Sequence, residues 1–298
     1  MTKITCIGAG NLGAAIAYEI ASRGIADELV LVDLLRDLAE GQAADILQAL
    51  PYQNKTKVSS GDYPAMAHSD VIVLTAGKPR TPDIKDRLQL AHINIKIVGS
   101  ILEEIKKYSP ESIIITLTNP MDMINHFIFT RGFAKEKVIG SGGQLDSSRF
   151  RVVLGFPEKE VEAYVLGEHG EDQAPLFSRV RINGQKRDFI EEEKIHFREK
   201  IRQTALTVIQ KKGATVFAPA SNTTDMVEAI IKDQKKLMIC SVNLQEEYGL
   251  YNVSLGVPVI LGRKGVENVK EWQLHPEELQ QLQDAGRKLK TSYNALGN

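Results

Sequence analysis

A glycine-rich turn near the N-terminus constrains the fold of this chain more strongly than any other feature. Residues 8–13 read GAGNLG, follow an apolar run at residues 4–7 and open a helix-like stretch at residues 11–23. In a turn from strand to helix, the first glycine permits the tight turn and the second lets a pyrophosphate approach the backbone. The third lets helix and strand pack closely. The helix N-terminus also offers unpaired N–H groups to phosphates, so the pattern predicts a dinucleotide-binding unit.

An acidic residue lies where such a unit contacts the ribose. Asp33 ends the second apolar run, twenty residues beyond Gly13, and a carboxylate there can accept both ribose hydroxyls. The same charge would repel the 2′-phosphate of NADP, so the sequence predicts NAD as the cofactor. Asp33 could instead serve only as a cap for the helix that follows.

The first half of the chain alternates apolar runs with helical patterns. Runs at residues 4–7, 29–32, 71–74, 113–117 and 138–140 are typical of parallel strands covered on both faces. Between them, residues 88–107 repeat isoleucine every four positions, close to the helical period. This alternation predicts an α/β fold, a doubly wound parallel sheet of the Rossmann type over residues 1–142.

The pattern changes in the second half, where strands and helices are mixed. We expect an α+β substrate-binding and catalytic domain over residues 143–298, with a hairpin turn at Asn183-Gly184. The expected helices are residues 145–154, 191–212, 218–232 and one opened by His275-Pro276. The expected strands are residues 161–167, 236–242 and 253–261.

Composition favours a protein that acts on small molecules. The net charge of −1 gives no indication of a nucleic-acid or membrane-surface partner. No apolar run approaches the roughly 20 residues that span a bilayer. Cys6 and Cys240 lie far apart, without the spacing of a disulfide framework or a zinc site. We therefore expect buried thiols, no metal and a cytoplasmic location.

Four further segments carry a resemblance to a known family. Residues 118–122 read TNPMD, residues 143–150 read GQLDSSRF, residues 167–170 read GEHG and, as a weaker match, residues 212–215 read KGAT. In this order the chain resembles the lactate/malate dehydrogenases, most closely the lactate-dehydrogenase-like malate dehydrogenases, from Gly8 to the helix after Pro276. The resemblance implies an NAD-dependent 2-hydroxy-acid dehydrogenase, with malate as the expected substrate and a homo-oligomer, tetramer or dimer, as the assembly. It also implies a place in the tricarboxylic acid cycle.

The expected chemistry needs a base and a carboxylate anchor. Oxidising a secondary alcohol requires a base for the hydroxyl proton, and histidine suits that task. The resemblance implies that His169 is this base and that Asp146 accepts its other N–H. Arg149, one helical turn after Asp146, could hold the substrate carboxylate through two hydrogen bonds. The alternative is a simple Asp–Arg pair within the helix.

Residues 77–87 (GKPRTPDIKDR) follow a predicted strand and are expected to form an active-site lid. Arg87 resembles the family's carbonyl-polarising arginine, and Arg80 its specificity residue, where arginine favours the second carboxylate of malate. The family pattern RKPGMxR has six steps between these arginines. Here there are seven, and Asp83 replaces the glycine. A solvated surface loop is the alternative.

Asn119 and Thr215 complete the expected substrate contacts. The residues expected to bind the cofactor are Gly8, Gly10, Asn11, Leu12, Gly13, Asp33, Ala76, Gly77, Asn94 and Asn119. Two other functions stay open: a dehydrogenase for lactate or another 2-hydroxy acid, and a non-catalytic NAD sensor. Intact Asp146, Arg149 and His169 count against the sensor.

Overall fold

The first half of the chain forms a parallel sheet. The computed structural model describes residues 1–50, 52, 55–79, 84, 86–156 and 160–297. Six strands pair in parallel in the order β3-β2-β1-β4-β5-β6. They are β1 (Lys3–Ile7), β2 (Glu28–Val32), β3 (Lys57–Ser60), β4 (Val71–Leu74), β5 (Ile113–Thr116) and β6 (Val138–Gly140). The predicted doubly wound sheet is confirmed.

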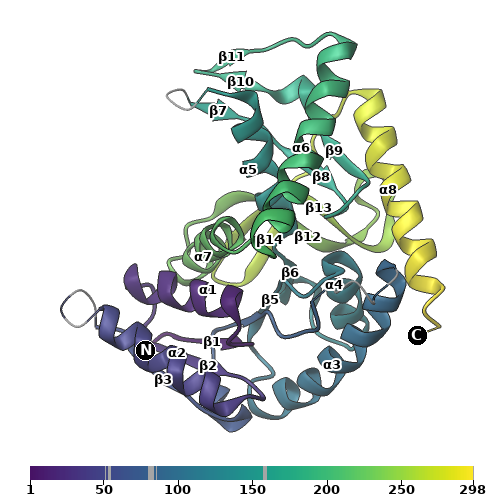
Figure 1. Ribbon diagram of the computed structural model, residues 1–298. Helices are drawn as coiled ribbons and strands as arrows, with labels where there is room; N and C mark the ends of the chain where they lie inside the picture. Colours follow the sequence, from purple (N-terminus) through teal and green to yellow (C-terminus); the bar gives the residue numbers. More distant parts are fainter. Residues whose placement is uncertain (51, 53–54, 80–83, 85, 157–159, 298) are drawn as a thin grey trace.

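Helices cover both faces of this sheet (Figure 1). α1 (Asn11–Ser22) and α2 (Arg36–Ala49) lie on one face, and α3 (Arg87–Tyr108) and α4 (Met121–Thr130) on the other. The central strands β4 and β5 are buried at every position, as the uninterrupted apolar runs predict. Short 3₁₀ turns connect the elements: η1 (Tyr63–Met66), η2 (Lys135–Lys137), η3 (Phe177–Arg179) and η4 (Glu247–Gly249).

The second half is a mixed α+β unit that extends the same sheet. β12 pairs with β6 at Ser241 and Gly140, so the sheet continues as β12-β13-β8-β9, with β14 on β13. The helices are α5 (Gly142–Leu154), α6 (Glu191–Lys212), α7 (Phe217–Ile231) and α8 (Pro276–Asn294). The strands are β7 (Val161–Glu162), β8 (Val165–Gly167), β9 (Gln173–Pro175), β10 (Arg181–Ile182), β11 (Gln185–Lys186), β12 (Lys236–Gln245), β13 (Tyr251–Gly262) and β14 (Gly265–Val269).

The single strand expected at residues 161–167 is wrong, because the chain changes sheets there. β7 pairs with β10 in a small separate sheet, whereas β8 pairs with β13 and β9 in the large one. The apolar residues between 163 and 166 serve two cores. Ala163 and Val165 pack in a cluster with Phe150 and Phe177, and Leu166 packs in the main core. One apolar run therefore does not imply one strand.

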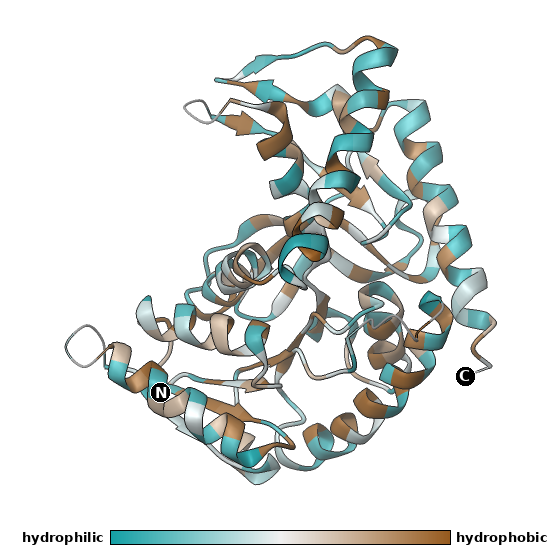
Figure 2. Ribbon diagram, viewed as in Figure 1, coloured by the Kyte–Doolittle hydropathy of each residue, from teal (hydrophilic) through white to brown (hydrophobic). Residues whose placement is uncertain are grey.

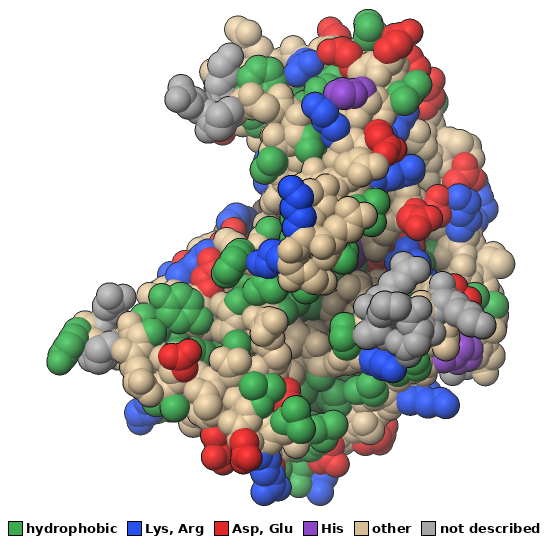
Figure 3. Space-filling model, in the orientation of Figure 1, with side chains coloured by type: hydrophobic (Ala, Val, Ile, Leu, Met, Phe, Trp, Pro, Cys, Tyr) green, Lys and Arg blue, Asp and Glu red, His purple; other side chains and the backbone are tan. Residues whose placement is uncertain are grey.

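Much of the length of α6 and α8, which lie on the outside of the second half, consists of hydrophilic residues (Figure 2). On the face drawn in Figure 3, basic and acidic side chains are interspersed. Within the described ranges, no helix combines the length and apolar character needed to cross a lipid bilayer. Both cysteines are buried as free thiols.

Candidate functional site

The turn between β1 and α1 has the geometry that a pyrophosphate requires. Gly8 has φ +103°, and a Cβ on it would lie 2.7 Å from the backbone nitrogen of Ala76. At Gly13 a Cβ would overlap the carbonyl oxygen of Gly8. At Gly10, by contrast, no described atom lies within 4 Å of the Cβ position. The first and third glycines are thus required by packing, and the second leaves open space over the N-terminus of α1, which fits a dinucleotide.

Asp33 lies at the end of β2, against the glycine turn. Its Oδ2 accepts the N–H of Ala9 at 2.7 Å, and its Oδ1 accepts the N–H of Leu35 at 2.9 Å. The carboxylate therefore orders the glycine turn and also acts as a local cap before α2. It is only partly buried, so its oxygens stay accessible to a ribose.

Asn94 joins the two loops that border the cofactor side of the cleft. Its Oδ1 accepts the N–H of Lys78 at 2.7 Å, and its Nδ2 donates to the carbonyl oxygens of Lys78 at 3.1 Å and Asn119 at 2.6 Å. The side chain is fully buried. Through these hydrogen bonds, Asn94 supports both loops. Of the other residues expected to bind the cofactor here, Gly77 and Asn119 are exposed and Ala76 is half-buried.

A chain of hydrogen bonds links the three residues expected at the reacting centre. His169 lies in the turn after β8, and its Nδ1 is 2.8 Å from Oδ2 of Asp146 on α5. The other oxygen, Oδ1, accepts from Nη1 of Arg149 at 2.9 Å. The Asp146 side chain is 2% exposed and that of His169 is 19% exposed. The imidazole is thus oriented by a buried carboxylate and still reaches the solvent side.

The surroundings favour the protonated imidazole. Burial of the ring lowers its pKa, but the charge and hydrogen bond of Asp146, together with the charge of Asp122, outweigh this and raise the pKa of His169 above its ordinary value. A histidine tuned in this way can hold a proton for a ketone and accept one from an alcohol at higher pH.

Asp122 is a further residue of the candidate site, which the sequence reasoning did not single out. It lies in the first turn of α4, is 1% exposed, and its Oδ2 accepts the backbone N–H of His169 at 2.7 Å. Burial raises the pKa of Asp122 to about 6, although Ser241 and His169 favour its charged form. The motif TNPMD contained this residue, but its contact with His169 spans 47 positions and no local pattern indicates it.

We expect Asp122→Asn to lower the pKa of His169. The amide oxygen can still accept the His169 N–H, but the negative charge that stabilises the imidazolium is removed. Reduction of the 2-oxo acid, which needs the protonated imidazole, should then begin to fall at a lower pH than in the wild type, measured as kcat/KM against pH. Asp37→Asn, an exposed carboxylate on α2, is the matched control. An unchanged pH profile in Asp122→Asn would remove Asp122 from this role.

The same variant should change the pH dependence of stability. The folded pKa of Asp122, about 6, lies above the ordinary value of 3.8, so the folded state prefers the protonated carboxyl. That stabilising contribution is complete below about pH 4 and is lost as the pH rises through about 6. Asparagine does not titrate, so the stability of Asp122→Asn relative to wild type should rise between pH 4 and pH 7.

Arg87 is the first residue of α3. The residue before it, Asp86, caps this helix, and its Oδ1 accepts the N–H of Gln89 at 2.8 Å. The guanidinium of Arg87 forms an ion pair with Glu168, and its Nη2 lies 3.3 Å from the carbonyl oxygen of His169. Arg80 lies outside the described residues, as do residues 81–83 and 85 of the expected lid. Thr215 is half-buried, and its Oγ1 has no hydrogen-bond partner in the part of the chain that the structure describes.

The comparisons with known proteins cover both halves of the chain. One family model, described as lactate/malate dehydrogenase, NAD binding domain, matches residues 2–140. A second, described as lactate/malate dehydrogenase, alpha/beta C-terminal domain, matches residues 143–297. The chain belongs to the lactate/malate dehydrogenase family. The predicted resemblance is therefore confirmed.

Relatives in both branches of this family match over their full length. The chain is 42% identical to a malate dehydrogenase of Halobacterium salinarum, over 99% of this chain and 100% of the relative. It is 35% identical to L-lactate dehydrogenase 1 of Clostridium acetobutylicum, over 99% and 98%. The solved malate dehydrogenase of Archaeoglobus fulgidus in complex with NADH superposes with a TM-score of 0.92 at 33% identity, covering 100% of both chains.

Family membership and the glycine turn together establish the class of this protein as an NAD-dependent oxidoreductase. The side chains available in the site agree with that class. His169 can exchange a proton, Asp146 can stabilise its charge, and Arg149 can bind a carboxylate. The described residues contain no group of three His, Cys, Asp or Glu side chains placed to hold a metal ion.

Proposed function

We propose that this chain is a malate dehydrogenase that interconverts (S)-malate and oxaloacetate with NAD(H). The observation that carries the proposal is the hydrogen-bonded set His169–Asp146–Arg149 in a chain that matches malate dehydrogenases from end to end. The acid/base pair fits alcohol oxidation, and the adjacent guanidinium fits a 2-hydroxy acid rather than a simple alcohol.

In this reaction each residue of the site would have a distinct role. Bound NAD⁺ supplies the hydride acceptor. His169 takes the hydroxyl proton while Asp146 stabilises the resulting imidazolium. Arg149 holds the carboxylate next to the reacting carbon through a planar pair of donors. Arg87 stabilises the negative charge that develops on the substrate oxygen, and Asn119 borders the nicotinamide side of the cleft.

We assign the preference for a four-carbon diacid to Arg80. An arginine in this lid can pair the second carboxylate of oxaloacetate, and a charge-assisted hydrogen bond of this kind is worth about 1.5–3 kcal/mol, or roughly tenfold to a hundredfold in affinity. Pyruvate would leave the guanidinium unpaired in a closed site, which adds to the discrimination.

We expect Arg80→Gln to lose roughly tenfold to a hundredfold of the oxaloacetate preference over pyruvate, measured as the ratio of the two kcat/KM values. NADH binding should stay near normal, because the glycine turn and Asp33 are untouched. Arg80→Lys, which keeps the charge, should retain part of the preference. An unchanged ratio in Arg80→Gln would exclude Arg80 as the ligand of the second carboxylate.

A lactate dehydrogenase is the second candidate. It is favoured by the seven-step spacing from Arg80 to Arg87, with Asp83 in place of the family glycine, and by the 35% identity to the clostridial L-lactate dehydrogenase. A shifted Arg80 would leave room for a small apolar substituent. Higher kcat/KM for pyruvate than for oxaloacetate in the wild type would select this function.

We further propose a homo-oligomer, tetramer or dimer, that acts in the cytoplasm within the tricarboxylic acid cycle. The exposed side chains of Leu34 and Leu35, just before α2, and of Leu38, in its first turn, support association. The free buried thiols suit a reducing compartment. We also propose that the chain consists of an NAD-binding domain, residues 1–142, and a substrate-binding domain, residues 143–298.

A further inference from the structure

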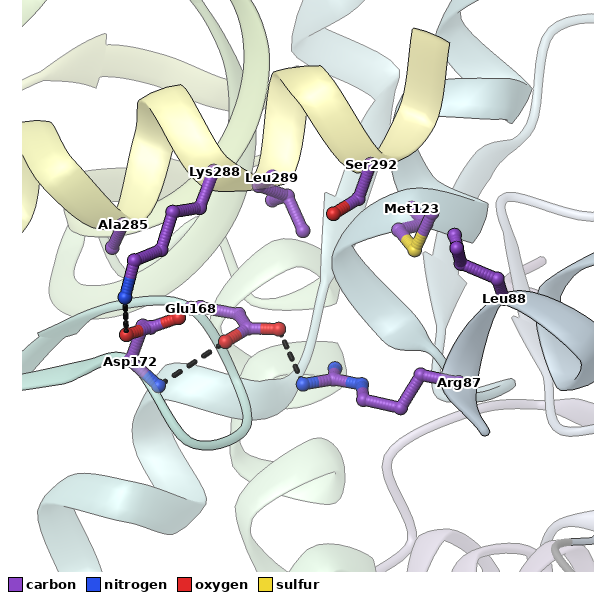
Figure 4. A pocket seen from close by; sticks show the side chains of 9 residues that line it. All are labelled: Arg87, Leu88, Met123, Glu168, Asp172, Ala285, Lys288, Leu289 and Ser292. Carbon is purple, nitrogen blue, oxygen red and sulfur yellow. Dashed lines mark hydrogen bonds and ion pairs between the residues drawn. The ribbon is translucent and has the colours of Figure 1, made fainter. Parts of the chain in front are cut away.

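The guanidinium of Arg87 contacts the turn that carries His169 instead of the open cleft. It pairs with Glu168, its Nη2 donates to the carbonyl oxygen of His169 at 3.3 Å, and a Cβ on Gly170 would overlap its Nη1. Arg87 thus contacts three successive residues of one turn, and Figure 4 shows its pair with the first of them, Glu168. Because Gly170 has no side chain, the guanidinium can lie directly against the backbone of the turn.

Arg87 is the more mobile partner of this pair, because Glu168 is fixed by its own turn. The second carboxylate oxygen of Glu168, Oε2, accepts the backbone N–H of Asp172 at 3.2 Å. The Glu168 side chain is 10% exposed, whereas that of Arg87 is 30% exposed. A long, partly solvated side chain at the first position of a helix can swing away, while the buried carboxylate cannot follow it.

The resting place is separate from the reacting centre. Arg87 and Glu168 line a small pocket beneath α8 together with Met123, Asp172, Lys288 and Leu289, and none of His169, Asp146 or Arg149 contributes to the described lining. In this position the guanidinium is paired with Glu168 and hydrogen-bonds the backbone carbonyl of His169. A substrate oxygen held at the imidazole would have to compete with Glu168 for the same guanidinium.

The structure assigns to Glu168 a positioning role: it holds Arg87 in a resting position from which the substrate oxygen must displace it. This inference rests on the proposed role of Arg87 at the substrate oxygen. Lys288, whose Nζ pairs with Asp172 at 2.6 Å, lines the same pocket as Glu168 (Figure 4). We expect its charge to remain in the pocket when Arg87 departs. The buried charge is then not left without a cation, which makes the exchange feasible.

Such a resting pair has a defined kinetic consequence. Only the fraction of enzyme with Arg87 released can bind the substrate oxygen through this guanidinium. The apparent dissociation constant of the 2-oxo acid therefore exceeds the intrinsic one by the reciprocal of that fraction. Weakening the pair should therefore tighten substrate binding. For a partly exposed ion pair with one buried partner, we expect a change of about threefold to tenfold.

The test is Glu168→Gln, assayed as KM and kcat for oxaloacetate with saturating NADH. Glutamine keeps an acceptor for the Asp172 N–H but removes the charge. We expect KM to fall about threefold to tenfold with no gain in kcat. Glu168→Asp, which keeps the charge but shortens the side chain, should lower KM less and serves if the glutamine variant does not fold. Glu171→Gln removes an exposed charge from the same turn and should leave KM unchanged.

A double-variant cycle separates this role from a structural one. In an Arg87→Gln background, Glu168→Gln should have no further effect on KM, because the arginine that Glu168 holds is already absent. An equal KM change in both backgrounds, or an increase of KM in the single variant, would overturn the proposal. The role of Arg87 itself is tested separately: Arg87→Gln alone should lower kcat, and an unaltered kcat would refute that role and not the contact with Glu168.

Discussion

Replacing His169 with asparagine should lower kcat for oxaloacetate reduction by about 10²- to 10⁴-fold, the usual contribution of a positioned general acid or base. The asparagine amide can still donate to Asp146 but cannot deliver a proton to the substrate oxygen. The site around it should stay intact, because the backbone N–H that binds Asp122 does not depend on the side chain.

The controls for this variant are NADH binding and thermal unfolding. NADH fluorescence titration should give a dissociation constant within a factor of about two of wild type, since the glycine turn lies on a different part of the sheet. Replacement of the solvent-exposed His92 by asparagine matches the change of residue type away from the site. Retention of wild-type kcat in His169→Asn would require another base and would refute the acid/base assignment.

Replacing Arg149 with glutamine should lower kcat/KM by about 10²- to 10³-fold, because two charge-assisted hydrogen bonds to the substrate carboxylate are lost together. Most of this loss should appear in KM. Part should appear in kcat, since Arg149 also donates to Asp146 at 2.9 Å and so helps to hold the carboxylate that orients His169.

Arg149→Lys distinguishes charge from geometry. Lysine keeps the positive charge but lacks the planar pair of donors, so it should recover only a minor part of the lost kcat/KM. The pH profile of kcat/KM in the lysine variant reports whether Asp146 still supports His169. If both variants bound the 2-oxo acid normally, Arg149 would be only the intrahelical partner of Asp146.

The parallel sheet and the glycine turn of the first half could be predicted from the sequence, because the relevant information is local. The glycine turn, the strand before it, the helix after it and Asp33 all lie within 31 residues. The steric role expected of each glycine in the turn follows from its position in the pattern. The cofactor contacts expected of these residues and of Asn94 stay predictions. The buried hydrogen bonds of Asn94 to two loops arise from tertiary structure, which the sequence pattern does not indicate.

The reacting centre was only partly predictable. Asp146 and Arg149 share a helical face at a spacing of three, so their pairing follows from local geometry. The contact of Asp146 with His169 came from the resemblance, since 23 residues separate them. The contacts of Asp122 with His169 and of Glu168 with Arg87 are longer in range still. The fold makes those contacts, and no periodicity or spacing in the sequence encodes them.

Strand boundaries in the second half were less predictable for a related reason. β12 extends beyond the expected residues 236–242 to Gln245, and β13 extends at both ends beyond the expected residues 253–261. In β12 the first added residue, Asn243, is polar and buried. A strand in the middle of a sheet can enclose polar side chains when tertiary partners surround them. An apolar pattern therefore ends before the strand does.

The central claim is tested most directly by measuring NADH oxidation with oxaloacetate and with pyruvate side by side on the wild-type protein, and by repeating both with NADPH. The account predicts a kcat/KM for oxaloacetate at least about tenfold above that for pyruvate, and a clear preference for NADH over NADPH. Turnover of pyruvate in preference to oxaloacetate would contradict the assignment of malate as substrate, and the absence of turnover with both acids despite NADH binding would contradict the proposed chemistry as a whole.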